Sequence, residues 1–183
     1  MNAKVRPLEM GDLDNIMKWV NDEEVIKNFQ NFDKKITREE EEAYLGRVLN
    51  SRDDKMFAIE TENGEYIGNI GLHQINSKNK LGRLGIIIGN REYWGKGYAQ
   101  SAINEVLRYA FEDFQLNKVW IMVFKENERM KYICKKAGFD IEGILRQEYS
   151  DKNGRYHDMV RMAILQEDYV RKKNEHRLLD VKV

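Results

Sequence analysis

A loop with two closely spaced glycines follows an apolar stretch in the middle of the chain. Residues 85–100 read GIIIGNREYWGKGYAQ, so three isoleucines lead into a loop in which Gly95 and Gly97 flank Lys96. The spacing of apolar residues predicts that a helix begins directly after this loop. Because the N–H groups at a helix start lack intrahelical partners and lie at the positive end of the dipole, the pattern is typical of a phosphate-binding turn.

Two common phosphate-binding motifs fit this loop poorly. A P-loop has four residues between its first glycine and its Gly-Lys pair, whereas five separate Gly89 from Gly95, and Gly97 stands where a hydroxyl is required. A dinucleotide fingerprint would have its third glycine at Gln100, and it belongs to an early strand-helix-strand unit rather than to a loop behind a hairpin. The P-loop is therefore excluded, and the dinucleotide motif is weakly matched.

The composition limits the class of protein. The 183 residues have the length of one domain, which we expect over 1–183 with 173–183 as a frayed tail. Lysine plus arginine and aspartate plus glutamate both number 31, which disfavours a nucleic-acid binder. One cysteine, Cys134, and three scattered histidines predict no disulfide and no metal site. No apolar run approaches the ~18 residues of a membrane helix, and a signal-peptide core is lacking, so we expect a soluble cytoplasmic protein without a membrane partner.

The periodicity of apolar residues places the loop within an order of strands and helices. Apolar stretches and turn residues predict three single strands and two hairpins, at 3–8, 81–88, 118–124, 55–75 and 139–165. Helical spacing predicts helices at 9–20, 37–50, 97–114 and 126–138. Asn127 and Gly138 are suited to start and stop the last of these helices. Crossovers require parallel pairing and hairpins require antiparallel pairing, so we expect one α/β domain with a mixed sheet.

The strand, the x-x-G-x-G-x-A turn and the long amphipathic helix together resemble the acetyl-coenzyme A site of the GNAT superfamily of N-acetyltransferases. Residues 125–143 resemble the family's N-x-x-A-x-x-x-Y-x-K-x-G-F helix, matching at Asn127, Lys136, Gly138 and Phe139. Residues 145–165 resemble the closing hairpin of the branch that acetylates ribosomal-protein amino termini, polyamines and amino sugars. The resemblance covers nearly the whole chain. It implies a mostly antiparallel central sheet flanked by helices, with a V-shaped splay between two central parallel strands.

The resemblance also implies acetyl-CoA as cosubstrate, and no metal. Backbone groups near Ile86, Ile87 and Ile88 would pair with the pantetheine arm as an added strand, in the gap beside the strand at 119–124. Glycines at 95 and 97 lack a Cβ atom, so a pyrophosphate could approach the backbone there. Lys96 could add charge or face solvent. The expected cofactor-binding residues are Ile86, Ile87, Ile88, Trp94, Gly95, Lys96, Gly97, Tyr98, Ala99 and Asn127.

Two positions depart from the family pattern. Glu92 stands where members often have arginine or glutamine near the phosphates, so one side-chain contribution is missing. Cys134 stands where many members have the tyrosine that protonates the departing thiolate, and Tyr132 lies on another face of the helix. A thiol with an unperturbed pKa of about 8.5 could act as the acid. The alternative is a packed thiol, because Cys134 shares its helix face with apolar residues.

Acetylation of an amine also needs a base and an acceptor pocket. The base candidates are His73, Glu148 and Tyr149, and we prefer Glu148 because the related branch often carries an acid there that would also attract a cationic amine. Trp19, Asn21, Glu23 and Asn69 are expected to wall the acceptor pocket. Acidic residues at 23–24 and 39–42 favour a polyamine acceptor, although the second run also fits a helix start that favours negative charge.

The predicted function is transfer of an acetyl group from acetyl-CoA to a primary amine, by direct attack in a ternary complex. The acceptor could be a polyamine such as spermidine, a protein amino terminus, an amino sugar or an antibiotic amine. The rival hypothesis is a coenzyme A-binding module without efficient turnover, suggested by the missing tyrosine at Cys134. Association into a homo-oligomer is left open.

Overall fold

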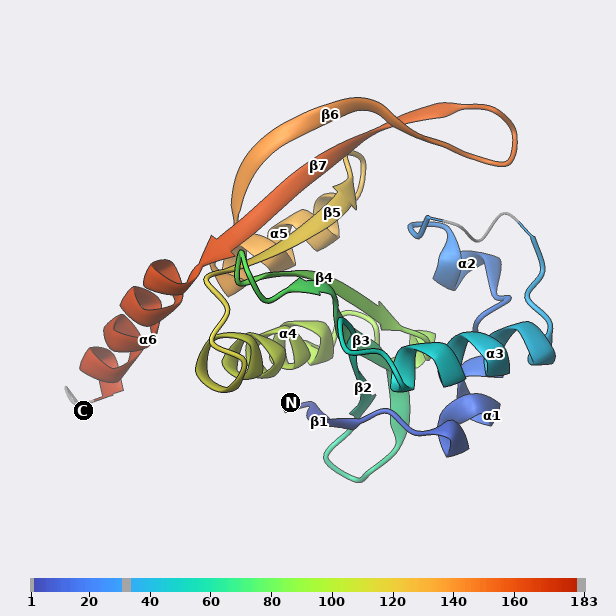
Figure 1. Cartoon of the computed structure of the whole chain (residues 1–183), viewed down its shortest axis with the longest axis horizontal. Helices are drawn as coiled ribbons and strands as arrows, with labels where there is room; N and C mark the ends of the chain where they lie inside the picture. Colours follow the sequence, from blue (N-terminus) through green and yellow to red (C-terminus); the bar gives the residue numbers. More distant parts are fainter. Residues whose placement is uncertain (1, 31–33, 181–183) are drawn as a thin grey trace.

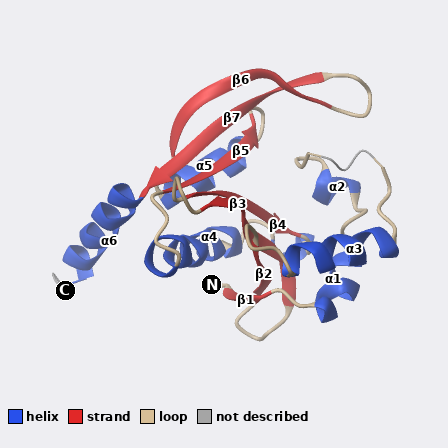
Figure 2. Ribbon diagram, in the orientation of Figure 1, coloured by secondary structure: helices blue, strands red, loops and turns tan. Residues whose placement is uncertain are grey.

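A computed structural model describes the backbone of residues 2–30 and 34–180 and the side chains up to residue 174. Its centre is a sheet of seven strands in the order β1-β2-β3-β4-β5-β7-β6 (Figures 1 and 2). The strands are β1 (Lys4–Pro7), β2 (Lys55–Glu60), β3 (Tyr66–Asn76), β4 (Leu81–Ile88), β5 (Lys118–Phe124), β6 (Asp140–Ser150) and β7 (Tyr156–Leu165). In the described strands β4 and β5 pair in parallel and all other neighbours are antiparallel. The predicted mixed, mostly antiparallel sheet is confirmed.

Helices flank this sheet. They are α1 (Leu13–Met17), α2 (Glu23–Ile26), α3 (Arg38–Leu49), α4 (Tyr98–Arg108), α5 (Glu128–Ala137) and α6 (Gln166–Asp180). A π-helical turn at Tyr109–Asp113 continues α4, and short 3-10 turns lie at Met10–Asp12 and Arg91–Tyr93. The short α2 was not predicted, because four residues carry too little periodicity to be recognised. Residues 181–183 of the expected frayed tail lie outside the described residues, while 173–180 continue α6.

The two faces of the sheet pack into two cores. Along β2, Phe57 and Ile59 belong to the core shared with α4 and α5, whereas Ala58 belongs to the core shared with α1 and α3. This alternation follows from the two-residue period of a strand, which sends neighbouring side chains to opposite faces. Both faces of β2 are therefore buried, and the α4 and α5 helices lie together on one side of the sheet (Figure 1).

The central parallel pair opens partway along its length. β4 pairs with β5 at Leu81–Lys118, Gly82–Val119 and Arg83–Trp120, and then both strands continue without pairing to each other. On their outer sides, β4 stays paired with β3 as far as Ile88, and β5 stays paired with β7 as far as Phe124. Each arm of the V is thus held by its other neighbour. The predicted splay is confirmed.

Candidate active site

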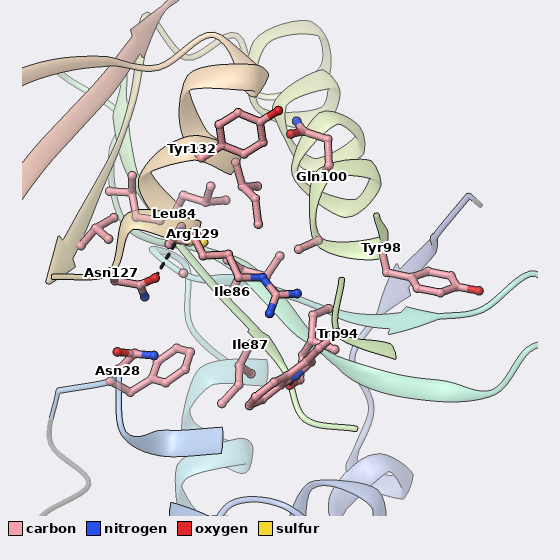
Figure 3. Close-up of a pocket in the computed structure, with 18 of the residues that line it drawn as sticks. Asn28, Leu84, Ile86, Ile87, Trp94, Tyr98, Gln100, Asn127, Arg129 and Tyr132 are labelled. Carbon is pink, nitrogen blue, oxygen red and sulfur yellow. Dashed lines mark hydrogen bonds between the residues drawn. The ribbon is translucent and has the colours of Figure 1, made fainter. Parts of the chain in front are cut away.

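The opening between β4 and β5 holds a cavity of about 580 Å³, here called the splay cavity (Figure 3). Its walls come from β4, the loop that follows β4, the start of α4, β5, α5 and the segment around α2. All but one of the predicted cofactor-binding residues line it. They are Ile86, Ile87, Ile88, Trp94, Gly95, Gly97, Tyr98, Ala99 and Asn127. Residues far apart in sequence therefore meet where the strand pairing ends.

The glycine turn has the backbone geometry that requires glycine. Gly95 and Gly97 have φ angles of +80° and +87°, a left-handed conformation that side chains rarely adopt. A Cβ atom at Gly97 would meet nothing within 4 Å, so the space before the backbone is open. Gly97 is also the N-cap of α4, whose first turn presents N–H groups without intrahelical partners. This cradle fits a phosphate group.

Side chains around the turn fix its position. The indole Nε1 of Trp94 donates a hydrogen bond of 2.8 Å to the carbonyl oxygen of Ile88 at the end of β4. The hydroxyl of Tyr98 donates a hydrogen bond of 2.9 Å to Glu62 in the β2–β3 turn. These bonds connect the loop to the end of β4 and to the β2–β3 turn, so the turn is held in place before any ligand arrives.

Arg129 is a functional candidate that the sequence did not reveal. It lies in the first turn of α5, and its guanidinium points into the splay cavity toward Trp94 and Tyr98 (Figure 3). A Cβ atom on Gly95 would lie 3.6 Å from its Nη2 atom. Lys96, by contrast, lies outside the residues that line the cavity, with its Nζ 5.3 Å from the ring centre of Tyr93. The cation that faces the turn thus comes from the opposite wall.

Asn127 acts on the cavity through α5. Its Oδ1 accepts a hydrogen bond of 3.0 Å from the backbone N–H of Met130, so it caps the helix as the sequence predicted. At the other end, Gly138 has a φ angle of +104° and terminates the helix. The cap fixes where α5 begins, and therefore where Arg129 enters the cavity.

Cys134 lies outside the splay cavity. Its side chain is fully buried in the core with Ala137, and burial raises the pKa of the thiol to about 12. The α5 residues that do line the cavity include Met130, Tyr132 and Ile133. Tyr132 is 63% exposed and its ring stands at the edge of the cavity (Figure 3). The thiol of Cys134 thus faces the core, whereas the phenol of Tyr132, two residues earlier, faces the splay cavity.

A second hollow of about 910 Å³, here called the outer cavity, adjoins the first. It lies between the segment around α2 and the turn that joins β6 to β7, and both cavities share Glu24, Asn28 and Phe29. Asn21 and Glu23, predicted to wall an acceptor pocket, line it. The other two predicted wall residues, Trp19 and Asn69, line neither cavity: both are buried, and Asn69 accepts a hydrogen bond from Tyr66.

The base candidates lie in three different places. Tyr149 lines the outer cavity. Glu148, on the exposed side of β6, lines neither cavity. His73 has its Nδ1 2.9 Å from Asp54, and its ring lies against Gly85, which lines the splay cavity. Burial alone would raise the pKa of Asp54. Hydrogen bonds from Ser51 and His73 outweigh this effect and hold the pKa below its usual value.

His157 is a further titratable group in the outer cavity. Its Nε2 lies 3.0 Å from Oδ2 of Asp151, and its ring meets Phe124 edge to face at 5.5 Å. The hydrogen bond from His157, with backbone N–H groups of Asn153 and Arg155, lowers the pKa of Asp151. In the sequence His157 stands beside Asp158 and is interpreted as a strand-pairing or turn residue, because its aspartate partner Asp151 lies across a hairpin turn. A carboxylate that orients an imidazole in this way favours proton transfer.

Neither a metal site nor a membrane span is found in the part of the chain that the structure describes. No three histidine, cysteine, aspartate or glutamate side chains in it converge as metal ligands. Nor does any helix in it combine the length and the apolarity that a membrane crossing requires.

Comparison with known proteins agrees with this geometry. The model of the acetyltransferase (GNAT) domain family matches residues 3–140. Spermidine N(1)-acetyltransferase of Escherichia coli K12 is 32% identical over 92% of this chain and 89% of its own. The Vibrio cholerae protein of that name is 33% identical over 93% and 98%. The crystal structure of the Vibrio cholerae spermidine N-acetyltransferase with CoA and spermine superposes with a TM-score of 0.83 at 30% identity, covering 92% of this chain and 98% of that one.

A second kind of relative is also found. A putative ribosomal N-acetyltransferase of Bacillus subtilis is 32% identical over 58% of this chain and 57% of its own. The related proteins thus carry names that refer to two different classes of amine.

Proposed function

The chain belongs to the GNAT acetyltransferase family and is an acetyl-CoA-dependent N-acetyltransferase, and we propose that it transfers the acetyl group to a primary amine by direct attack in a ternary complex. The observation that carries this proposal is that the splay cavity and the outer cavity lie next to each other and share Glu24, Asn28 and Phe29 in their walls. Two substrates can occupy the two spaces at once, so no acetylated enzyme is needed.

The splay cavity suits the coenzyme. Beyond Arg83 the edge of β4 that faces β5 has no strand partner, so the backbone of Ile86 and Ile87 can pair with an extended pantetheine arm. The open turn at Gly95 and Gly97 and the guanidinium of Arg129 suit the phosphates. Acetyl-CoA supplies a thioester whose carbonyl carbon forms a C–N bond with the amine while the C–S bond breaks and the thiol leaves.

The amine must lose a proton to attack, and we propose two candidates for the base. Glu148 is the candidate from the sequence, and from its exposed position it would have to act through water. His157 is the candidate that the geometry adds, since it lines the outer cavity and is oriented by Asp151. Histidine is the side chain that most often acts as a general base.

We propose that Cys134 is a packed thiol rather than the acid for the leaving group. The support is its complete burial and its place outside the splay cavity. Solvent or Tyr132, which lines the cavity, would then give the thiolate its proton. The rival function, a coenzyme-binding module without efficient turnover, keeps its support from the same missing tyrosine.

Three acceptor classes follow from the relatives and from the closing hairpin: polyamines, protein amino termini and amino sugars. The names of the Escherichia coli and Vibrio cholerae relatives put spermidine first. The deciding experiment measures thiol release from acetyl-CoA with spermidine, with Ala- and Ser-starting peptides and with amino sugars. Turnover with at least one amine is expected. Binding of acetyl-CoA by calorimetry with no turnover on any amine would support the coenzyme-binding module.

A further inference from the structure

We infer that the preferred acceptor is a small amine that also carries an anionic group, held in the outer cavity by lysine and arginine side chains. This inference rests on the proposed function, because it names the substrate class of that same site. It differs from a polyamine, which carries only positive charge. The chemistry that would be recognised is a primary amine joined to a phosphate or a carboxylate.

The charged side chains of the outer cavity do not favour a polycation. Among the residues that the structure describes, five cations line it, namely Lys27, Lys34, Lys35, Lys152 and Arg155. Four described carboxylates line it, namely Glu23, Glu24, Glu126 and Asp151. A ligand with several positive charges would therefore meet at least as many positive groups as negative ones, and like charges in one cavity repel.

Most of these carboxylates are already engaged. Glu24 pairs with Lys27 at 2.7 Å, and Glu23 lies 3.9 Å from Lys152 across the cavity. The carboxylate of Asp151 accepts hydrogen bonds from the ring of His157 and from backbone N–H groups of its own turn. A polyamine would have to share these acids with the groups that already contact them.

One acid and two cations of the cavity make no ion pair within the described residues. The acid is Glu126, which lies two residues beyond the end of β5 and so stands near the end of the splay. The cations are Lys35, ahead of α3, and Arg155, in the β6–β7 turn. The amine of the acceptor can thus approach the splay beside Glu126 while its anionic group meets Lys35 and Arg155.

The acidic run at 39–42, which favoured a polyamine in the sequence, lies elsewhere. None of its four side chains lines either cavity. Glu40 instead completes a capping box with Thr37 at the start of α3 and pairs with Lys34 at 2.5 Å. The run therefore stabilises a helix start, and its charge does not serve the acceptor.

Aromatic rings form part of the wall of the outer cavity. Phe124 meets Tyr149 at 5.6 Å and His157 at 5.5 Å, both edge to face, and all three line the outer cavity. Such a wall offers apolar surface to a ring with axial C–H groups, which a sugar has. A phosphorylated amino sugar is therefore the first form of the acceptor to test, and an amino acid is the second.

The test compares matched acceptors that differ only in the anionic group. Initial rates at fixed acetyl-CoA are measured for glucosamine and glucosamine 6-phosphate, for alaninamide and alanine, and for spermidine. At least one anionic member is expected to exceed its neutral partner by about tenfold in kcat/KM, equivalent to about 1.4 kcal/mol. Which pair shows the preference identifies phosphate or carboxylate as the recognised group. The preference should fall with added salt, because ionic contacts at an open cavity are screened.

Two substitutions locate the effect. The double variant Lys35→Gln/Arg155→Gln should lose the preference through a higher KM for the anionic acceptor, with kcat and the neutral acceptor nearly unchanged. Lys78→Gln, in the β3–β4 turn and away from both cavities, is the matched control and should keep the preference.

The outcomes test the anionic acceptor and the acetyltransferase reaction separately. Turnover with spermidine that exceeds every anionic acceptor, or a double variant that keeps the preference, overturns the anionic acceptor and leaves the acetyltransferase reaction standing. Binding of acetyl-CoA without turnover on any of the amines overturns the reaction itself.

Discussion

The splay cavity and the outer cavity are built from different parts of the chain. The splay cavity depends on backbone: an unpaired strand edge along β4, two glycines with positive φ angles and a helix start. The outer cavity depends on exposed side chains from a short helix and a hairpin turn. Backbone geometry suits a ligand that is the same across a family, whereas exposed side chains can change from protein to protein without disturbing the fold. We therefore propose that the first cavity binds the coenzyme and that the second selects the acceptor.

The largest expected effect lies in the outer cavity, at His157. Replacing it with glutamine should lower kcat/KM about 100-fold, the lower end of the range for general bases, because the amide cannot accept the amine's proton. Acetyl-CoA affinity should stay the same. The matched comparison is Glu148→Gln, for which we expect less than a threefold change. Rates measured across pH decide between them: an equal loss in both variants, or a larger loss at Glu148, would return the base to the sequence-predicted position.

The next effect tests the backbone character of the splay cavity. Gly97→Val should weaken acetyl-CoA binding at least tenfold, about 1.4 kcal/mol, because the side chain would enter the open space before the turn. Gly64→Val is the control, since Gly64 also has a positive φ of +83° and open space around it but lies in the β2–β3 turn. Both variants should lose stability, and only the first should lose affinity in calorimetry. Equal affinities would remove the turn from the phosphate site.

A smaller effect is expected for the side chain that faces the turn. Arg129→Gln should weaken acetyl-CoA binding about fivefold at low salt, because an ion pair at an open cavity contributes about 1 kcal/mol. Acetyl-pantetheine, which lacks the nucleotide phosphates, should bind both proteins alike. Lys96→Gln is the matched control, since Lys96 lies beside Tyr93 and outside the cavity walls. A greater loss at Lys96 would show that the loop lysine holds the phosphates.

The smallest effect on turnover is expected at Cys134. Cys134→Ala should lower the free energy of unfolding by about 1 kcal/mol, as a small core truncation does, and keep turnover within tenfold of the parent. Since burial raises the pKa of the thiol to about 12, the native protein should also resist alkylation by iodoacetamide at neutral pH. A hundredfold loss of rate in a folded Cys134→Ala protein would make this thiol the catalytic acid.

The contrast between backbone geometry and exposed side chains also explains which site residues could be predicted from the sequence. Gly95, Gly97, Asn127 and Gly138 have roles that follow from their own backbone conformations, so local patterns were enough to find them. Arg129 was missed because a surface arginine at a helix start looks the same whether it faces solvent or a cavity. Its role depends on the splay, which brings α5 opposite the turn.

The residues proposed to bind the acceptor could not be predicted for a related reason. Lys35, Glu126 and Arg155 line one cavity only because the fold brings together the segment ahead of α3, the residues after β5 and the β6–β7 turn. In the sequence these charged residues look like any others on a solvent-exposed surface. The acidic run at 39–42, which reads as a feature in the sequence, is explained by the start of α3.

The short parallel ladder has a consequence for how long the protein survives. Three residue pairs supply all the strand pairing that joins β1–β4 to β5–β7 in the described sheet, so a coenzyme bound between the arms would act as a missing strand that joins the two halves. A ligand at 100 times its dissociation constant stabilises a fold by about 2.7 kcal/mol. Amide hydrogens along the inner edges of β4 and β5 should then exchange slowly only in the liganded protein. Resistance to proteolysis would rise and fall with the supply of acetyl-CoA, and the abundance of the enzyme would follow that of its own cosubstrate.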